Sequence, residues 1–315
     1  MKELKRKKIM KHWLSCDWGT SAFRLRLVER DSCRVVSEEK SGYGISTAFR
    51  DWQASVMPRE AFFAGIIRRG IVMLGERTGL RLEGLPVVLS GMASASIGMV
   101  ELPYHELPFS LNGRDLHVQA FEEFLIISGA RFSDDVMRGE ETKIAGCAAW
   151  LKDDAEEKRL LLPGTHPKHV VVQGGKAIAF KTFMTGELFD LLSKHSILSA
   201  SVNTGGILEA PGAGEAFRSG LIAGKSGDLL HEVFMVRTNQ LLKNVPPELN
   251  SFYLSGLLIG SELSSLPSHQ PVYLVAGALH GQLYATACEA LGIPVSAIID
   301  ADEALIRGQA AVLNH

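Results

Sequence analysis

Residues 13–28 have the sequence WLSCDWGTSAFRLRLV, which is the most informative stretch of the chain. Residues 13–16 are mainly apolar, and residues 23–28 alternate between apolar and charged side chains, so both are predicted strands. The Asp, Gly, Thr and Ser residues at positions 17–21 favour a turn between the two strands. We therefore expect a β-hairpin with a polar turn at its tip.

The turn of this hairpin has the groups that phosphate binding requires. Gly19 has no side chain to block a close approach, and Thr20 and Ser21 add hydroxyl groups to the backbone N–H groups of the turn. Asp17 offers a carboxylate to Mg²⁺, which prefers oxygen ligands and keeps much of its own water. A single turn of this kind is weak evidence, because similar turns occur in ordinary hairpins.

A second Gly-Thr turn occurs in the other half of the chain. Gly164 and Thr165 separate an apolar run at 160–162 from a β-branched run at 170–172, a pattern that predicts another hairpin. Backbone N–H groups in this turn would also face a bound anion. Two such turns in separate halves indicate a phosphate chain that is held from both sides.

The remaining chain alternates between predicted strands and helices, which is typical of an α/β protein. In the first half we expect a helix over 59–80, a strand over 86–89, and a strand, a helix and a strand within 115–127. The expected helices of the second half are 185–198, 252–264, 281–291 and one from about 303, and its expected strands are 272–275 and 295–299.

The length of 315 residues is about twice that of a typical domain, so two domains are expected. A charged stretch at 152–159 is the best candidate for the boundary between them. We predict a basic tail at 1–12, an N-terminal domain at 13–151 and a C-terminal domain at 158–315. The 31 glycines follow no repeat, so they are expected to serve turns and close backbone contacts.

Composition and charge exclude several classes of protein. The 33 Lys and Arg residues against 35 Asp and Glu residues give a net charge of −2, which argues against a nucleic-acid-binding protein. No apolar stretch long enough for a membrane span or a secretory signal follows the basic start, so no membrane partner and a cytoplasmic location are expected. The four cysteines form no C-x-x-C pair, so neither a zinc site nor a redox motif is indicated.

Four segments together resemble the superfamily of actin, hexokinase and the sugar kinases. They are Asp17-x-Gly19-Thr20-Ser21 with Arg24, the Gly164-Thr165 turn, residues 272–278 with the following helix, and Gly308-Gln309-Ala310-Ala311. They occur in the order in which this superfamily has its two phosphate loops, its adenosine-binding segment and its last helix. The resemblance implies a two-domain α/β fold of the actin-like (ribonuclease H-like) ATPase type, with ATP in a cleft between the domains.

Further motifs resemble one family within this superfamily, the 2-dehydro-3-deoxygalactonokinases. These motifs are Ser90-Gly91-Met92, residues 136–142, 162–166 and 183–188, and residues 254–260. Membership implies that ATP phosphorylates the 6-hydroxyl of 2-dehydro-3-deoxy-D-galactonate in galactonate breakdown. The implied partners are a sugar acid, ATP and Mg²⁺. The implied nucleotide-binding residues are Gly19, Thr20, Ser21, Gly164, Thr165, Gly277, Ala278 and Leu279.

The superfamily also has an acidic residue between the two phosphate loops that takes the proton of the sugar hydroxyl. Glu140 matches that place best, although the superfamily has Asp there, and Glu141 is the alternative. Both glutamates could instead be first-turn carboxylates that stabilise a helix through its dipole. The catalytic groups implied by the resemblance are therefore Glu140 as base and Asp17 as the Mg²⁺ ligand.

The sugar acid carries a carboxylate, which a guanidinium can bind through two hydrogen bonds. Arg138 is the first candidate for this contact and Lys168 the second, and either could simply be a surface charge. Related sugar kinases bind sugar with the loop that follows the strand equivalent to 86–89. The candidate substrate-binding residues are Ser90, Gly91, Met92, Ser94 and Arg138.

Three short motifs permit more than one interpretation. Arg24 either supports the first phosphate turn or faces solvent. Thr185 with Glu187 either lines the cleft or caps a helix. His166 and His169 offer two metal ligands, but no third His or Cys follows at a suitable spacing.

Two other functions remain open from the sequence alone. The first is a kinase for another sugar or sugar acid, such as 2-dehydro-3-deoxygluconate, with unchanged phosphate loops and different substrate loops. The second is a non-enzymatic conformational switch driven by ATP. The sequence also leaves open whether the chain forms a homo-oligomer.

Overall fold

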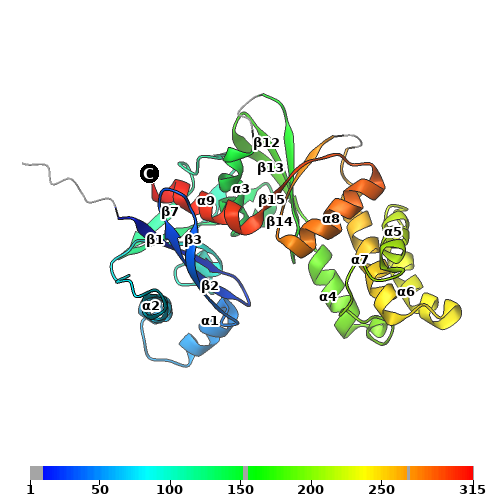
Figure 1. The fold of residues 1–315 in the computed structure, drawn as a ribbon, viewed down its shortest axis with the longest axis horizontal. Helices are drawn as coiled ribbons and strands as arrows, with labels where there is room; N and C mark the ends of the chain where they lie inside the picture. The colour runs from blue at the N-terminus through cyan, green and yellow to red at the C-terminus, as the bar shows by residue number, and fades with distance from the viewer. Residues whose placement is uncertain (1–9, 152–154, 268–269, 315) are drawn as a thin grey trace, which may run out of the picture. The chain divides into compact units, whose positions relative to one another are not determined.

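A computed structural model describes residues 10–151, 155–267 and 270–314 of the chain. The chain folds into two compact units, each with its own sheet and helices (Figure 1). The first unit comprises residues 1–154, 174–178 and 302–315, and the second comprises 155–173 and 179–301. The predicted basic tail at 1–12 lies almost wholly outside the described residues.

The first unit is built on a six-stranded mixed sheet with the order β3-β2-β1-β4-β8-β7. The first three strands form antiparallel pairs, whereas β4 runs parallel to both β1 and β8. The side chains of Leu14, Cys16 and Trp18 on β1 are fully buried, which places this strand in the core. The strands are β1 (His12–Trp18), β2 (Phe23–Glu29), β3 (Val35–Ser41), β4 (Val87–Gly91), β7 (Val118–Phe121) and β8 (Phe124–Ile127).

The expected helix within 115–127 is wrong, because this segment is a hairpin of β7 and β8. Phe121 pairs with Phe124, so only Glu122 and Glu123 remain for the turn. Glu122 has a positive φ of 50°, which is typical of tight hairpin turns. A two-residue connection leaves no length of chain for a helix.

The other elements of the first unit include helices and a separate three-stranded sheet with the order β10-β9-β5. The expected helix over 59–80 is confirmed as α2, which begins after Pro58 and ends at Gly79 with φ 68°. A left-handed glycine at this position is a common helix end. The remaining elements are α1 (Ile45–Gln53), α2 (Arg59–Thr78), η1 (Met92–Ser94), β5 (His105–Glu106), β9 (Ala130–Phe132), β10 (Asp135–Met137), α3 (Glu140–Gly146) and η2 (Cys147–Ala149).

The second unit has a sheet with the order β15-β14-β11-β12-β13, and the first residues of β13 pair with β6 (Phe109–Ser110) within the first unit. The predicted hairpin of 160–172 is confirmed as the antiparallel pair β11–β12. The strands are β11 (Lys158–Leu162), β12 (Lys168–Gln173), β13 (Lys176–Thr182), β14 (Val272–Ala276) and β15 (Val295–Asp300). The helices are α4 (Thr185–His195), η3 (Ile197–Ala200), α5 (Ala213–Gly224), α6 (Leu229–Lys243), α7 (Pro247–Leu263) and α8 (Ala278–Leu291).

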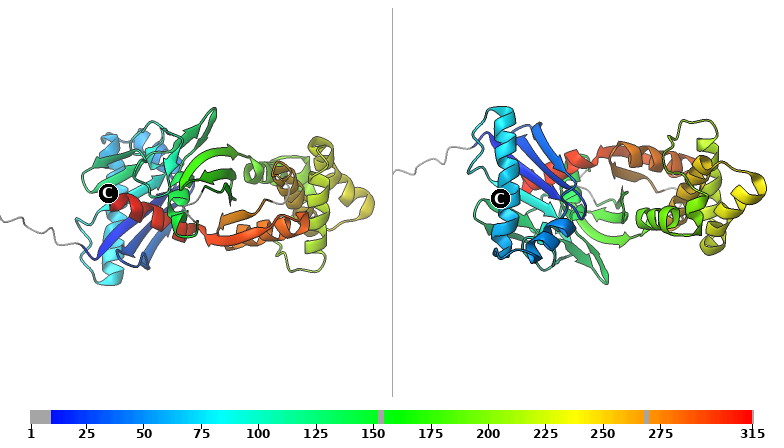
Figure 2. Two further views of the ribbon diagram at one scale, coloured as in Figure 1. Left: turned by 90° about the horizontal axis from the view of Figure 1, so that it is seen from above. Right: turned by 90° about the horizontal axis from the view of Figure 1, so that it is seen from below.

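The last helix, α9 (Ala301–Leu313), belongs to the first unit from Asp302 onward (red in Figures 1 and 2). It crosses α3 at two glycines with the backbones in contact. A Cβ on Gly308 would lie 1.8 Å from the Thr142 carbonyl oxygen, and one on Gly146 would lie 1.7 Å from that of Ala304. Only glycine at both positions permits this crossing.

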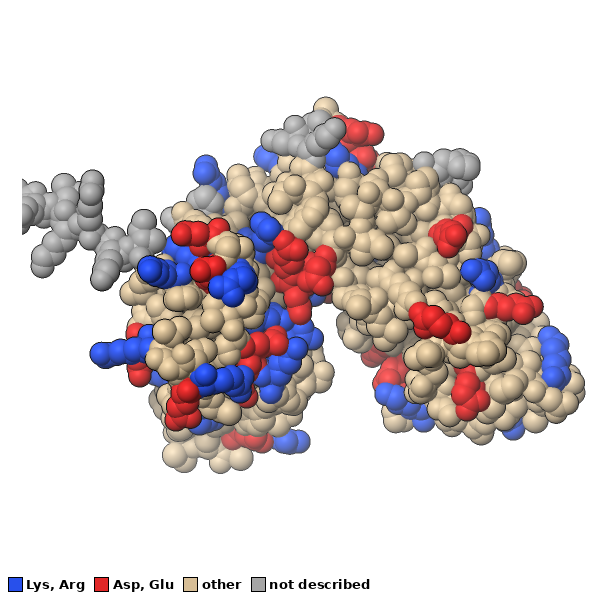
Figure 3. Space-filling view, viewed as in Figure 1, with Lys and Arg blue, Asp and Glu red and all other residues tan. Residues whose placement is uncertain are grey.

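Charged side chains of both signs are interspersed on the face that Figure 3 shows, in keeping with the net charge of −2. Within the described ranges, every helix is too short or too polar to cross a lipid bilayer.

Candidate active site

The first predicted phosphate turn joins β1 to β2 and is held in shape by its own backbone. The Gly19 N–H donates to the Ala22 carbonyl oxygen at 2.9 Å and closes the turn. The carbonyl oxygens of Gly19 and Thr20 accept hydrogen bonds from the N–H groups of Ile45, at 3.0 Å, and Ser46, at 3.2 Å. These two donors are the first residues of α1, so the helix end fixes the turn.

This geometry narrows the set of N–H groups that could meet a phosphate. The Gly19 N–H is engaged in the turn, whereas those of Thr20 and Ser21 donate to no backbone carbonyl in the described part of the chain, and both residues are exposed. A Cβ on Gly19 would meet only the Ala22 oxygen, at 3.6 Å, so this side of the turn is open. Sequence reasoning missed Gly44, where a Cβ would lie 2.3 Å from the Thr20 oxygen.

Asp17 is the second-to-last residue of β1 and lies between two other predicted site residues. It pairs with Arg24 of β2 on one side and with Ser90 of β4 on the other. A Cβ on Gly91 would lie 3.5 Å from Asp17 Oδ1, so the carboxylate lies against the start of the predicted sugar loop. Within the described residues, no group of three His, Cys, Asp or Glu could hold a metal ion.

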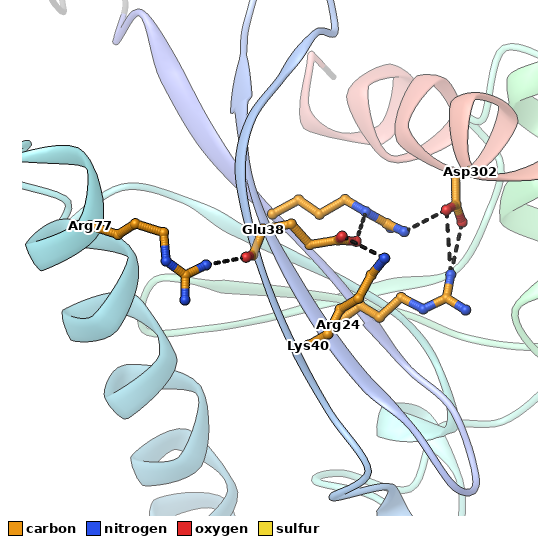
Figure 4. Close-up of polar contacts among 6 residues, drawn as sticks. Arg24, Glu38, Lys40, Arg77 and Asp302 are labelled. Carbon is orange, nitrogen blue, oxygen red and sulfur yellow. Dashed lines mark hydrogen bonds and ion pairs between the residues drawn. The ribbon is translucent and has the colours of Figure 1, made fainter.

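Arg24 belongs to a network of charges that joins β2 to α9 (Figure 4). Its Nη1 lies 3.0 Å from Asp302 Oδ1, and Nη2 of the fully buried Arg26 lies 2.9 Å from Asp302 Oδ2. Arg26 Nε also donates to Glu38 Oε1 at 2.8 Å, and Lys40 pairs with the other oxygen of Glu38. Arg24 therefore ties the phosphate-turn hairpin to the first turn of the last helix.

The predicted sugar loop after β4 is brought together with Arg138. Arg138 Nη1 donates to both the carbonyl oxygen and the hydroxyl of Ser94, each at 2.6 Å, and its Cζ lies 4.3 Å from the centre of the Tyr104 ring. Arg59 holds the far end of the loop through the carbonyl oxygens of Ser96 and Gly98, both at 2.6 Å. Tyr104 and Arg59 were not singled out by the sequence.

Ser90 and Met92 differ in their access to a ligand. Ser90 is fully buried, and its hydroxyl accepts a hydrogen bond from Gln309 Nε2 at 2.8 Å. Gln309 also donates to the Cys16 carbonyl oxygen at 3.0 Å, so it joins the ends of β1 and β4. Met92 is only partly buried. Ser90 therefore shapes the loop, while Met92 and Arg138 retain access to its surface.

The two candidate bases lie at the start of α3 in different surroundings. Glu140 is partly exposed, and its Oε2 accepts a hydrogen bond from the Arg138 N–H at 3.1 Å. Glu141 is fully buried and accepts hydrogen bonds from the Gly139 N–H, at 2.6 Å, and the Thr142 hydroxyl, at 3.0 Å. Burial, followed by the charge of Glu140, raises the pKa of Glu141 to about 7.

In the second unit, the turn at Gly164 and Thr165 is packed against the start of α4. The Thr165 carbonyl oxygen accepts a hydrogen bond from the Glu187 N–H at 3.0 Å, and a Cβ on Gly186 would lie 2.4 Å from the Gly164 oxygen. Lys168, the second candidate for the substrate carboxylate, is buried in this unit. Its Nζ donates to the His166 carbonyl oxygen at 2.7 Å.

A cavity of about 530 Å³ opens beside this turn and is lined by α4, α7, α8, Thr204 and Gly206. Gly164, Thr165 and Leu279 of the predicted nucleotide set line it, whereas Gly277 and Ala278 precede the lining part of α8. The α7 residues Ser255 and Leu258 also line the cavity. Sequence reasoning placed a helix at 252–264 without giving it a role in binding.

Thr185 lines this cavity and does not cap α4. The residue before the helix is Met184, and no side chain caps the helix there. The Thr185 hydroxyl instead donates to Glu262, which also accepts from His169 Nε2, at 2.9 Å, and from the Tyr284 hydroxyl, at 2.7 Å. His169 Nε2 is therefore engaged by a carboxylate.

A family model for the 2-keto-3-deoxy-galactonokinases matches residues 17–312, which is nearly the whole chain. The chain belongs to this family. A 2-dehydro-3-deoxygalactonokinase of Escherichia coli (strain K12) is 32% identical over 297 residues, which cover 91% of this chain and 92% of that protein. A protein of Rhizobium meliloti (strain 1021), described as a probable 2-dehydro-3-deoxygalactonokinase, is 34% identical over 95% of this chain and 96% of its own length.

Solved structures confirm the fold expected for this kinase family. A crystal structure of a candidate 2-dehydro-3-deoxygalactonokinase from Sinorhizobium meliloti matches with a TM-score of 0.79 and 32% identity, over 96% of each chain. The activator of 2-hydroxyisocaproyl-CoA dehydratase from Clostridium difficile, solved with bound ADPNP, matches with a TM-score of 0.51 and 10% identity, over 96% of this chain and 94% of that chain. The protein has the two-domain α/β fold of the actin-like ATPases.

Proposed function

We propose that the protein transfers the γ-phosphoryl group of ATP to the 6-hydroxyl of 2-dehydro-3-deoxy-D-galactonate, giving 2-dehydro-3-deoxy-6-phosphogalactonate and ADP. The observation that carries this proposal is the family match over residues 17–312, supported by relatives of equal length that are named for this activity. The two phosphate turns, the cavity of the second unit and the Arg138 loop supply the chemistry that the reaction requires.

In this proposal, nucleotide-binding residues are assigned to each unit. The adenosine occupies the cavity beside α7 and α8, with Leu279 at its wall. The phosphates accept hydrogen bonds from the N–H groups of Thr20 and Ser21 in one turn and from the Gly164–Thr165 turn in the other. Mg²⁺, held through Asp17, would neutralise phosphate charge, because Asp17 is partly exposed beside the first turn and offers oxygen ligands.

The sugar acid is placed beside Met92 and Arg138, while the fully buried Ser94 orients the Arg138 guanidinium. The Arg138 guanidinium donates two hydrogen bonds to Ser94 and lies against the Tyr104 ring. Its remaining N–H groups can therefore bind the substrate carboxylate. Glu140 then takes the proton of the 6-hydroxyl as that oxygen forms its bond to the γ-phosphorus. The bond between the γ-phosphorus and the β–γ bridging oxygen breaks, and ADP leaves with the electron pair.

The test is an assay that couples ADP release to a recorded signal, run with 2-dehydro-3-deoxygalactonate, 2-dehydro-3-deoxygluconate and simple hexoses. We expect turnover with the galactonate derivative to exceed that with each other acceptor. A preference for another acid would reassign the substrate and leave the kinase chemistry in place. Tight ATP binding without turnover of any acceptor would favour a conformational switch and contradict the proposal.

A further inference from the structure

Glu262, on α7, is a buried carboxylate beneath the cavity of the second unit that the proposed reaction does not use. Only 1% of its side chain is exposed. Three side chains from three different elements surround it: Thr185 of α4 and Tyr284 of α8 through their hydroxyls, and His169 of β12 through Nε2. A carboxylate with three donors is a well-satisfied buried group.

The direction of these hydrogen bonds follows from the chemistry of the groups. An ionised carboxylate can only accept, and a hydroxyl has a single hydrogen to donate. The hydrogens of the Thr185 and Tyr284 hydroxyls therefore point toward Glu262. Burial and the neighbouring Glu262 charge raise the pKa of Tyr284 well above its usual value, so its phenol keeps that hydrogen.

Both hydroxyl-bearing residues also line the cavity. Each of these hydroxyls already donates its hydrogen to Glu262. Toward a ligand, their oxygens can therefore only accept hydrogen bonds. A ligand group that meets Thr185 from the cavity must therefore be a donor. A carbonyl or phosphate oxygen at that place would face another acceptor and lose its own hydrogen bond to water.

We propose that Glu262 makes this floor of the nucleotide cavity an acceptor-only surface, which selects a hydrogen-bond-donating group of the nucleoside through Thr185. This inference rests on the proposed function, since it takes the cavity to be the adenosine site. Two groups of ATP fit the requirement: a ribose hydroxyl and the exocyclic amine of adenine. Thr185 is then a specificity-determining residue and Glu262 a positioning residue.

The test measures nucleotide dissociation constants by calorimetry, so it does not depend on turnover of the sugar acid. The probes are ATP, its 2′-deoxy and 3′-deoxy analogues, and inosine triphosphate, in which a carbonyl oxygen replaces the amine. We expect the wild-type protein to bind ATP about tenfold more tightly than at least one analogue, the size of effect of one hydrogen bond. The analogue that binds weakly tells which donor meets Thr185.

Two substitutions at Thr185 test whether the discrimination arises there. Thr185→Val has the same shape without the hydroxyl, so the difference between ATP and that analogue should fall to less than about twofold. Thr185→Ser keeps the hydroxyl and should retain most of the difference. Full discrimination in Thr185→Val, or none in the wild-type protein, would overturn the inference.

Glu262→Gln provides an independent measurement, because His169 determines how the new amide is oriented. With the His169 hydrogen kept on Nε2, as its bond to the carboxylate requires, the amide oxygen takes its side and the NH₂ group faces Thr185 and Tyr284. The two hydroxyls would then accept from Gln and turn their hydrogens toward the cavity. We expect this variant to lose or reverse the preference for the donor, and an unchanged preference would contradict the role of Glu262.

The failure of this inference can be told apart from failure of the proposed function. If the wild-type protein binds none of the nucleotides, the cavity is not an adenosine site and both proposals are overturned. If it binds ATP and phosphorylates the sugar acid while Thr185→Val discriminates as before, only the inference about Thr185 and Glu262 fails.

Discussion

Glu140 and Glu141 are neighbours in the chain, yet only Glu140 has access to a substrate. If Glu140 is the base, Glu140→Gln should lower kcat at least ~10²-fold, because general-base catalysis contributes about that much. Its KM for ATP should change little. The measurement is steady-state kinetics with the galactonate derivative, with Glu141→Gln as the matched control. A larger loss in Glu141→Gln than in Glu140→Gln would move the role to Glu141.

Glu141 should make the stability of the protein depend on pH. Its pKa rises from 4.5 to about 7 on folding, so the folded state favours the protonated form. The cost of ionising it is absent below pH 4.5, grows as the pH rises toward 7, and then stays constant. With about 1.4 kcal/mol for each pH unit, the cost reaches about 3 kcal/mol.

Glu141→Gln removes this titration and thus isolates its contribution. Urea unfolding at about pH 5 and about pH 8 should show the free energy of unfolding of the wild-type protein falling by about 2.5 kcal/mol relative to that of the variant, because part of the cost is already present at pH 5. Glu140→Gln removes only the second cause of the raised pKa, the charge of Glu140, and should therefore keep most of this pH dependence. Parallel pH dependences of the wild-type protein and Glu141→Gln would show that Glu141 does not carry this effect.

Candidate residues that lie in short motifs could be named from the sequence, whereas those assembled by the fold could not. Asp17, Thr20 and Glu140 could be proposed because neighbouring residues form a pattern around them. Glu262 and Tyr284 were not named, because residues that bind Glu262 are distant from it in the chain. His169, for example, lies 93 residues away. A buried glutamate within an apolar helix was the available signal, but only tertiary contacts identify its donors.

At the scale of elements, the crossing of α3 and α9 should tolerate no side chain. Gly308→Ala would place a Cβ 1.8 Å from the Thr142 carbonyl oxygen, so the helices must separate. We expect the free energy of unfolding to fall by about 3 kcal/mol. Gly65→Ala, in the middle of α2, is the matched control because its Cβ would meet only the end of Arg69, at 3.9 Å.

In that control, alanine should raise the free energy of unfolding by about 0.5–1 kcal/mol, because it restricts the unfolded chain and favours the helix. Both variants are compared by urea unfolding at one pH. Equal effects of the two substitutions would mean that α3 and α9 are not in backbone contact.

The attachment of α9 to β2 gives a second prediction for this helix. Asp302→Asn removes the charge that faces the buried guanidinium of Arg26, leaving only Glu38 to compensate it. We expect a loss of about 2 kcal/mol, below the full cost of breaking a buried pair because Asp302 is half exposed. Thermal and urea unfolding would measure this loss.

The adjacent Glu303 supplies the control for that substitution. It pairs with Arg307 one turn later at 2.8 Å, and both side chains are exposed to a similar degree. Glu303→Gln should cost less than about 0.5 kcal/mol, as is usual for exposed helix pairs. If the two variants are equally stable, the network in Figure 4 contributes nothing beyond an ordinary surface pair.

The elements with a clear hydrophobic period were predictable, and those that depend on a turn were not. Helix α2 and strand β14 are long or strongly apolar, and both occur where expected. The segment 115–127 was misassigned because its apolar residues suit either a helix or two short strands. The two-residue turn at Glu122 and Glu123 is compatible with two strands and not with a helix. This backbone geometry cannot be read from the pattern of apolar residues.

For the whole molecule, the first unit should depend on the last helix while the second unit does not. Residues 302–315 belong to the first unit, where Gln309 reaches β1 and β4 and Asn314 accepts a hydrogen bond from Arg30 at 2.7 Å. Deleting them should expose amides of β1 and β4 to solvent. We expect these amides to exchange hydrogen at least ~10²-fold faster than in the full chain.

The same measurement contains its own control, because the second unit has a separate core. Amides of β14 and α7 should keep their protection in the shortened chain, since the apolar cluster around Leu274 and Leu221 includes no residue of α9. Uniform loss of protection in both units, or none in β1 and β4, would show that the last helix does not complete the first unit alone.

The placement of α9 also has a consequence for the folding of the chain during its synthesis on the ribosome. When residues 1–154 have left the exit tunnel, the sheet that bears the first phosphate turn still lacks the helix whose Gln309 and Asp302 bind it. The second unit, by contrast, is complete once Ala301 has emerged. Translation therefore completes the second unit before the first, and the predicted first phosphate turn gains the contacts of Asp302 and Gln309 only when α9 has been synthesised.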